Sequence, residues 1–128
     1  METQVEIASV RPVVVIVDDD PAVRNALAFS LQAEGFRVRS YASGMELLED
    51  SPTAKTGCLV IDYQLPGMNG LDLLVELRRR QVAAPAILIT THPSAAVRER
   101  AAATGVAVVE KPLLGDALFQ EIYAALHG

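Results

Sequence analysis

Four apolar runs in this chain each lead into a residue that could take part in phosphoryl transfer. Three consecutive aspartates, Asp18–Asp20, follow the first run, and a single aspartate, Asp62, follows another. Thr90 closes a third run, and Lys111 comes after a fourth. A carboxylate between a buried strand and a turn is held in place, as a nucleophile must be. We therefore interpret Asp62 as a nucleophile that accepts a phosphoryl group and forms an acyl phosphate.

The aspartates also predict a metal ion. If the first and third strands are neighbours, Asp18 and Asp19 lie next to Asp62, and the carboxylates repel one another. A hard divalent cation, Mg²⁺ or Mn²⁺, would remove this repulsion. Mg²⁺ is usually held by one or two carboxylates, waters and phosphate oxygens. The Lys111 ammonium and the Thr90 hydroxyl could each donate to a further phosphoryl oxygen, so the set suits transfer by alignment and charge neutralisation.

Strands and helices are expected to alternate along the chain. Strands are predicted at 13–17, 36–41, 58–61, 85–90 and 106–109, and helices at 21–34, 44–50, 70–81, 94–104 and 114–126. This order predicts a single doubly wound α/β domain, with helices on both faces of a five-stranded parallel sheet in the flavodoxin-like order 2-1-3-4-5. Functional groups gather at the carboxyl ends of the strands in such a sheet.

The first predicted helix has clear start and stop signals. Asp20 at the N-cap and Pro21 at the first helical position favour a start there, and Gly35 favours an end. Its periodicity predicts a buried face made of Val23, Ala26, Leu27, Ser30 and Leu31.

The composition favours one compact domain that does not bind nucleic acid directly. The chain has 128 residues, is 51% hydrophobic and carries a net charge of −5, whereas phosphate contacts need clustered cations. The basic run Arg78–Arg80 ends a predicted helix, so we interpret it as a solvated helix end, with a docking patch as the alternative. Residues 1–11 are expected to form a leader and residues 12–128 the domain.

The same sequence predicts a cytoplasmic location without membrane insertion. No apolar run approaches the ~20 residues that cross a bilayer, and the acidic N-terminus lacks the layout of a signal peptide. Cys58 has no second cysteine with which to form an internal disulfide, which fits a reducing compartment.

The motifs together resemble the receiver domain of bacterial two-component response regulators. They read V-D-D-D-P, V-I-D-Y-Q-L-P-G-M-N-G, I-L-I-T-T and E-K-P, in that order. The resemblance covers roughly Val13 to Leu126, and the sequence around Asp62 and over 18–31 is nearest to that of FixJ-type receivers. It implies a CheY-like fold and a phosphorylation-controlled signalling switch.

Site roles follow from the resemblance, motif by motif. Asp62 matches the phosphoacceptor and is also a metal ligand. Asp18 and Asp19 match the acidic pair, with Asp19 the direct ligand, and the backbone carbonyl of Gln64 matches a further ligand. Asp20 matches a position that is often acidic without binding the metal, in agreement with its interpretation as a helix cap.

The remaining motifs imply a switch. Thr90 matches the switch hydroxyl, and Lys111 matches the phosphoryl-binding lysine, followed by a proline whose preceding peptide bond is cis in the family. Val108 stands where many family members have an aromatic residue, which leaves an aromatic rotamer switch in doubt. Gln64 and His92 are implied to flank the phosphoryl group and to tune its hydrolysis.

The resemblance also implies partners. A histidine kinase or a histidine phosphotransfer protein would donate the phosphoryl group. The phosphorylated form would then act on a downstream protein target or a fused effector domain, through the face formed by the predicted elements at 94–104, 106–109 and 114–126. The chain is expected to be a monomer that could dimerise when phosphorylated, and to act as a signalling domain without a separate substrate.

Two other classes of protein share part of this pattern. A Mg²⁺-dependent phosphatase with an aspartyl-phosphate intermediate would share the nucleophile and the metal, but such enzymes usually carry a second aspartate where this chain has Gln64. A flavin-binding module would share the fold class, but the first strand is not followed by a loop rich in glycine and hydroxyl groups.

Overall fold

The computed structural model describes residues 12–50, 56–113 and 116–127. The predicted leader at 1–11 lies outside these residues. The elements are β1 (Val13–Val17), α2 (Pro21–Ala33), β2 (Arg37–Tyr41), α3 (Gly44–Asp50), β3 (Thr56–Asp62), α4 (Gly70–Arg79), β4 (Ala86–Thr90), α5 (Ala95–Ala103), β5 (Ala107–Glu110) and α6 (Ala117–His127). Among the described residues, no helix combines the length and the apolar character that a bilayer crossing requires.

The strands form one parallel sheet in the order β2-β1-β3-β4-β5, which confirms the predicted fold class. Val17 of β1 is paired with Ile61 of β3, so the residues that follow them, Asp18 and Asp62, are also adjacent. Asp62 is in turn paired with Ile89, the residue before Thr90. The registers therefore bring the predicted functional residues to one edge of the sheet.

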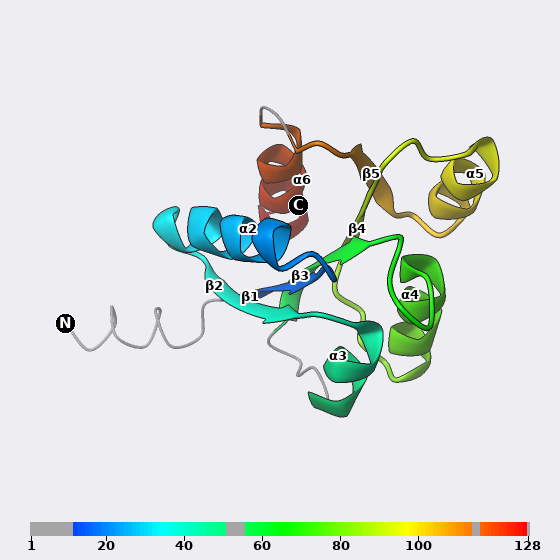
Figure 1. The fold of residues 1–128 in the computed structure, drawn as a ribbon, viewed down its shortest axis with the longest axis horizontal. Coiled ribbons are helices and arrows are strands. Elements are labelled where there is room, and N and C mark those ends of the chain that lie inside the picture. Colours follow the sequence, from blue (N-terminus) through cyan, green and yellow to red (C-terminus); the bar gives the residue numbers. More distant parts are fainter. Residues whose placement is uncertain (1–11, 51–55, 114–115, 128) are drawn as a thin grey trace.

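Helices cover both faces of the sheet (Figure 1): α2 and α6 lie on one side, and α3, α4 and α5 lie on the other. The core under α2 and α6 includes Val14, Ile16, Val60, Leu27, Leu31 and Ile122. The core under the other three helices includes Val15, Leu59, Ile61, Leu47, Leu73 and Leu77. Because β1 is buried along its whole length, it reads as an apolar run without alternation.

Helix α2 begins and ends where its sequence signals predict, but its buried face is narrower. Asp20 is the N-cap and accepts hydrogen bonds from the backbone of the first turn, and Gly35 adopts φ 93° just after the helix. Leu27 and Leu31 are buried, whereas Ala26 is exposed, so its predicted burial is wrong. Ala26 lines a groove between α2 and α6, where the two helices leave a gap above the sheet.

The side chains of the Arg78–Arg80 run contact this domain itself, and Arg80 also donates to the carbonyl of Leu48 in α3 at 3.1 Å. Arg79 and Arg80 both pair with Glu76, one turn earlier in α4. Arg78 donates to the carbonyl of Val82, and burial lowers its pKa. These bonds favour the helix-end interpretation over the docking patch. The last helix begins at Ala117, later than predicted, and residues 114–115 lie outside the described part of the chain.

Candidate functional site

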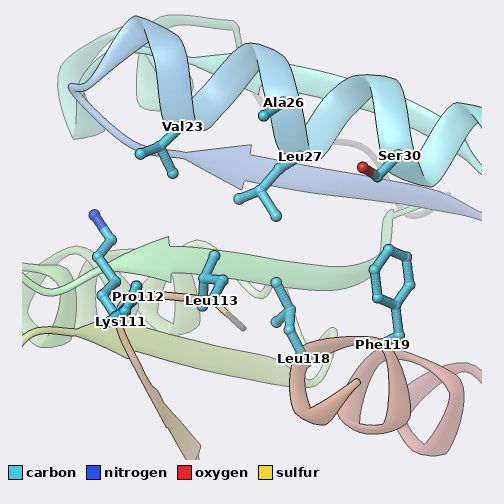
Figure 2. Close-up of a pocket in the computed structure, with 9 residues that line it drawn as sticks. All are labelled: Val23, Ala26, Leu27, Ser30, Lys111, Pro112, Leu113, Leu118 and Phe119. Atoms are coloured by element: carbon cyan, nitrogen blue, oxygen red, sulfur yellow. The ribbon is translucent and has the colours of Figure 1, made fainter. Parts of the chain in front are cut away.

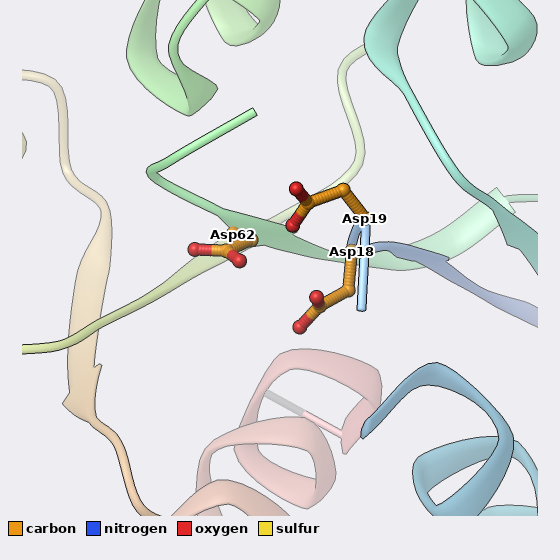
Figure 3. Close-up of side chains that lie close together, drawn as sticks. All are labelled: Asp18, Asp19 and Asp62. Carbon is orange, nitrogen blue, oxygen red and sulfur yellow. The ribbon is translucent and has the colours of Figure 1, made fainter. Parts of the chain in front are cut away.

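Three carboxylates meet at the carboxyl edge of the sheet (Figure 3). Asp18 and Asp19 follow β1, Asp62 ends β3, and each offers an oxygen within 4.8 Å of the others. Asp18 and Asp62 are 0% and 4% exposed, whereas Asp19 faces solvent. This all-oxygen donor set, open on one side, fits a hard divalent cation that also keeps water or phosphate ligands.

Asp62 is held by a donor on each of its two carboxylate oxygens. The backbone N–H of Gln64 donates to Oδ1 at 3.1 Å, and Nζ of Lys111 donates to Oδ2 at 2.9 Å. Burial nevertheless raises the pKa of Asp62. The bonds from Lys111 and Gln64 oppose this shift, while the charge of Asp18 adds to it. The charged form of Asp62 is therefore fixed in position but incompletely stabilised.

Lys111 lies between two of the acids. Its Nζ is 2.9 Å from Asp62 Oδ2 and 3.0 Å from Asp18 Oδ2. Burial alone would lower the pKa of Lys111, but its interactions with Asp62 and Asp18 outweigh burial and raise it. The two pKa shifts therefore have different main causes, which are burial for Asp62 and the neighbouring carboxylates for Lys111. The Lys111–Pro112 peptide bond is cis, as the resemblance implies.

The Asp18 carboxylate shows how a cation would fit. Its Oδ1 accepts from the backbone N–H of Asp20 at 2.9 Å. Its Oδ2 is buried and receives no aligned hydrogen bond within the described chain, although the Lys111 ammonium is near. Because Lys111 is shared with Asp62, this buried oxygen is only partly satisfied and is suited to a cation ligand, since an incompletely satisfied buried acceptor is costly.

Backbone hydrogen bonds fix the strand ends that carry these groups. The N–H of Tyr63 donates to the carbonyl of Ile89 at 2.9 Å, and the N–H of Lys111 donates to that of Thr90 at 2.8 Å. Thr90 is 2% exposed and ends β4, at the same edge as Asp62. These bonds place three strand ends in register. The role of the Thr90 hydroxyl as a switch stays a prediction.

The structure brings together most of the side chains that the sequence predicts for the site. Asp18, Asp19 and Asp62 form one cluster, and Lys111 contacts two of its members. Gln64 lies beside Asp62 through its N–H, whereas the role of its carbonyl as a metal ligand stays a prediction. Asp20 caps α2, as expected, and its carboxylate bonds the first turn of the helix.

Two contacts at the site were not foreseen from the sequence. The Nη1 of Arg24 donates to the backbone carbonyl of Asp18 at 2.7 Å. A Cβ at Gly70 would lie 2.5 Å from the carbonyl oxygen of Asp62, so only glycine lets α4 approach the site this closely. Two features of the sequence could have pointed to these residues. Arg24 is a cation near the start of a helix, where positive charge is unfavourable, and Gly70 directly follows the helix cap Asn69.

Val108 departs from the family pattern, His92 is implied by the resemblance to flank the phosphoryl group, and the two differ in burial. Val108, in the place of the aromatic residue, is half-buried and packs against the core under α4 and α5. His92 is exposed and adopts φ 48°, an uncommon conformation for a residue other than glycine. Its predicted effect on phosphoryl hydrolysis stays a prediction.

Comparison with known proteins agrees with this geometry. The family model described as "Response regulator receiver domain" matches residues 14–123. The transcriptional regulatory protein FixJ of Azorhizobium caulinodans is 35% identical over 112 residues, which cover 87% of this chain and 53% of that protein. The chain spans about half the length of the curated relatives it matches. The predicted similarity to FixJ-type receivers is confirmed.

Solved structures show the same fold. The Vibrio cholerae chemotaxis protein CheY4 has a TM-score of 0.82 at 24% identity, covering 91% of this chain and 99% of that one. The response regulator TrrA of Thermotoga maritima, solved in complex with Mg²⁺-BeF, has a TM-score of 0.75 at 27% identity, covering 90% and 99%. With its family model, its relatives and its acidic site in agreement, the chain belongs to the receiver domains of two-component response regulators, the phosphorylation-controlled switches of these signalling systems.

Proposed function

We propose that Asp62 is the phosphoacceptor of this receiver domain and that Asp18, Asp19 and Asp62 hold Mg²⁺ or Mn²⁺ during the transfer. The observation that carries the proposal is the position of Asp62, buried beside two further acids and bonded to Lys111. The carbonyl of Gln64 would complete the protein ligands. The metal would neutralise negative charge on the incoming phosphoryl group.

The chain's own groups align and stabilise the reaction. An oxygen of Asp62 attacks the phosphorus of a phosphohistidine, the P–N bond breaks, and the imidazole leaves with the bonding electron pair and takes up a proton. The Gln64 N–H keeps the Asp62 carboxylate oriented. Lys111 then moves its hydrogen bond from Asp62 to a phosphoryl oxygen, and Thr90 donates to another.

The donor would be a histidine kinase or a histidine phosphotransfer protein, docked over α2 and α6. An apolar groove of about 290 Å³ runs between these helices and reaches Lys111 at one end (Figure 2). Leu27 of α2 faces Leu118 of α6 across it, and Val23 lies at the end nearer Lys111 and Pro112. A helix of the donor seated here would bring its histidine close to Asp62.

The output would pass through the α5-β5-α6 face, to a protein target, a fused effector domain or a second phosphorylated copy. Arg98 of α5 pairs with Glu110, the residue before Lys111. Arg100 of α5 pairs with Asp72 of α4. A displacement of Lys111 or Thr90 would therefore reach α5 through the Arg98–Glu110 pair, because Glu110 precedes Lys111 and is paired with Thr90 in the sheet. The domain itself would act as a signalling switch, without turnover of a separate substrate, and the comparisons lend no support to the phosphatase alternative.

Intact mass spectrometry after incubation with Mg²⁺ and acetyl phosphate tests the proposal. Wild type should gain the mass of one phosphoryl group, and the Asp62→Asn variant should gain none. Asp20→Asn is the matched control, because it removes a neighbouring carboxylate that caps α2, and it should still be phosphorylated. An adduct that persists in Asp62→Asn, or repeated hydrolysis of a phosphate monoester, would contradict the proposal.

A further inference from the structure

Arg24 occupies an unusual place for a cation. It lies in the first turns of α2, where the helix dipole disfavours positive charge. Its side chain reaches back past the helix start, and Nη1 donates to the carbonyl of Asp18 at 2.7 Å in a partly buried contact. A charge-assisted hydrogen bond of this kind is stronger than a neutral one, so it can offset the unfavourable placement.

The carbonyl that Arg24 binds belongs to the peptide unit joining Asp18 to Asp19. The neighbouring bonds are already made: the N–H of Asp18 donates to Tyr41 at 3.1 Å, and Asp18 Oδ1 accepts from Asp20. Arg24 therefore fixes the plane of the following peptide. That plane sets the direction in which the Asp19 side chain leaves the backbone, and Asp19 is the solvent-facing member of the acidic cluster.

We propose that Arg24 is a positioning residue for the metal-binding acids, acting through the Asp18 carbonyl to hold Asp19 beside Asp18 and Asp62. This inference rests on the metal site of the proposed function. It assigns Arg24 no contact with the phosphoryl group or with the metal itself.

If Arg24 acted only through its charge, its removal would change the Mg²⁺ affinity in the opposite direction. Arg24 brings positive charge near three carboxylates, so its charge alone would repel a divalent cation. Removing that charge would strengthen cation binding, whereas loss of the positioning bond would weaken it. Groups that orient metal ligands typically change metal affinity by about 10–100-fold when they are removed. The sign of the change in Mg²⁺ affinity therefore separates the two roles.

Calorimetric titration with Mg²⁺ alone tests the inference on wild type, Arg24→Ala, Arg24→Lys and Arg79→Ala. Arg79→Ala is the matched control, because it removes an equal charge from an exposed residue of α4 whose ion pair within the described chain is with Glu76. Arg24→Ala should bind Mg²⁺ about tenfold more weakly, Arg24→Lys should recover part of the loss, and Arg79→Ala should match wild type.

A second measurement does not depend on metal. In the metal-free protein, loss of the bond to the Asp18 carbonyl should shift the amide nitrogen resonance of Asp19 in Arg24→Ala, with partial return in Arg24→Lys. Unchanged or tighter Mg²⁺ binding in folded Arg24→Ala would overturn the positioning role while leaving the metal site intact. If Arg24→Ala does not fold, Arg24→Met carries the test, because it keeps an aliphatic side chain and cannot donate, and affinity equal to that of wild type with an unshifted Asp19 resonance would overturn the role. Absence of saturable Mg²⁺ binding in wild type would overturn the metal site and this inference with it.

Discussion

At the scale of single residues, Asp62 carries a charge that the surrounding protein does not fully offset. Its carboxylate is buried and faces Asp18, and Lys111 supplies positive charge from one side only. Burial raises the pKa of Asp62, which means that the folded protein holds the proton of this group more readily than the unfolded chain does. Ionised Asp62 thus costs the metal-free protein stability, and a bound cation would remove that cost.

Asp62→Asn should therefore stabilise the metal-free protein at neutral pH. A group with a raised pKa in the folded state contributes stability that is present below its unfolded pKa and lost as the pH rises through its folded pKa. The gain from Asp62→Asn should be largest at pH 7 and should shrink as the pH falls toward the ordinary aspartate pKa of about 3.9. Urea unfolding in chelator at several pH values measures it. A loss of stability at pH 7, or a gain that grows in acid, would contradict the prediction.

Gly70 shows why some residues of the site could not be predicted. The sequence places a glycine after the turn, and turns commonly contain glycine for their backbone freedom. Gly70 instead begins α4, and its missing side chain makes room for the carbonyl of Asp62 and the side chains of Ile61 and Leu88. Such a close approach depends on the packing of α4 against β3, which is not encoded in the local pattern.

At the scale of elements, the helix ends were predictable where glycine marks them. In α2 and α5 a glycine, Gly35 or Gly105, follows the cap residue with positive φ, and the next residue donates back into the last turn. Helix α4 ends with the same hydrogen bonds, but Gln81 occupies the glycine position with φ 66°. Because glutamine is not a helix stop signal, the helix predicted at 70–81 ends two residues beyond α4.

Gln81→Gly should stabilise the protein by about 0.5–1 kcal/mol. The left-handed conformation costs a residue with a Cβ roughly 1–2 kcal/mol, and the greater freedom of glycine in the unfolded chain returns part of that gain. The N–H of residue 81 would still donate to Arg78, so the hydrogen bonds of the helix end are kept. Thermal and urea unfolding measure the change.

Gln81→Ala is the control for Gln81→Gly. Alanine also carries a Cβ, so it should give none of the gain that depends on positive φ. Equal stabilisation by alanine and glycine would show that the side chain of Gln81, and not its backbone conformation, is responsible.

At the scale of the whole molecule, the sheet topology made the acidic site predictable. Apolar runs such as Val13–Val17 identify strands buried on both faces, and the strand order places the ends of β1 and β3 side by side. The contact between Arg24 and Asp18 could not be predicted in this way, because it depends on how a long side chain folds back over the start of α2. The exposure of Ala26 could not be predicted either, because helical periodicity identifies the inward face of α2 but not the distance between α2 and α6.

The acids follow or end two strands, β1 and β3, and two of them contact Lys111, which follows a third strand, β5. Metal binding should therefore stabilise the whole fold. A ligand that binds only the folded state at 100 times its dissociation constant adds about 2.7 kcal/mol. For a domain of this size that corresponds to a rise in melting temperature of roughly 10 °C. Thermal unfolding of wild type with saturating Mg²⁺, compared with NaCl of equal ionic strength, should show this rise.

Two neighbouring substitutions separate specific binding from a general effect of charge. Asp19→Asn removes an exposed member of the acidic cluster and should abolish most of the Mg²⁺-dependent rise in melting temperature. Asp20→Asn removes the same charge one residue later, keeps a good N-cap for α2, and should retain the rise. An equal loss in both variants would mean that Mg²⁺ acts by screening the acidic edge. Retention in both would mean that the ion binds without Asp19, and the proposed ligand set would be wrong.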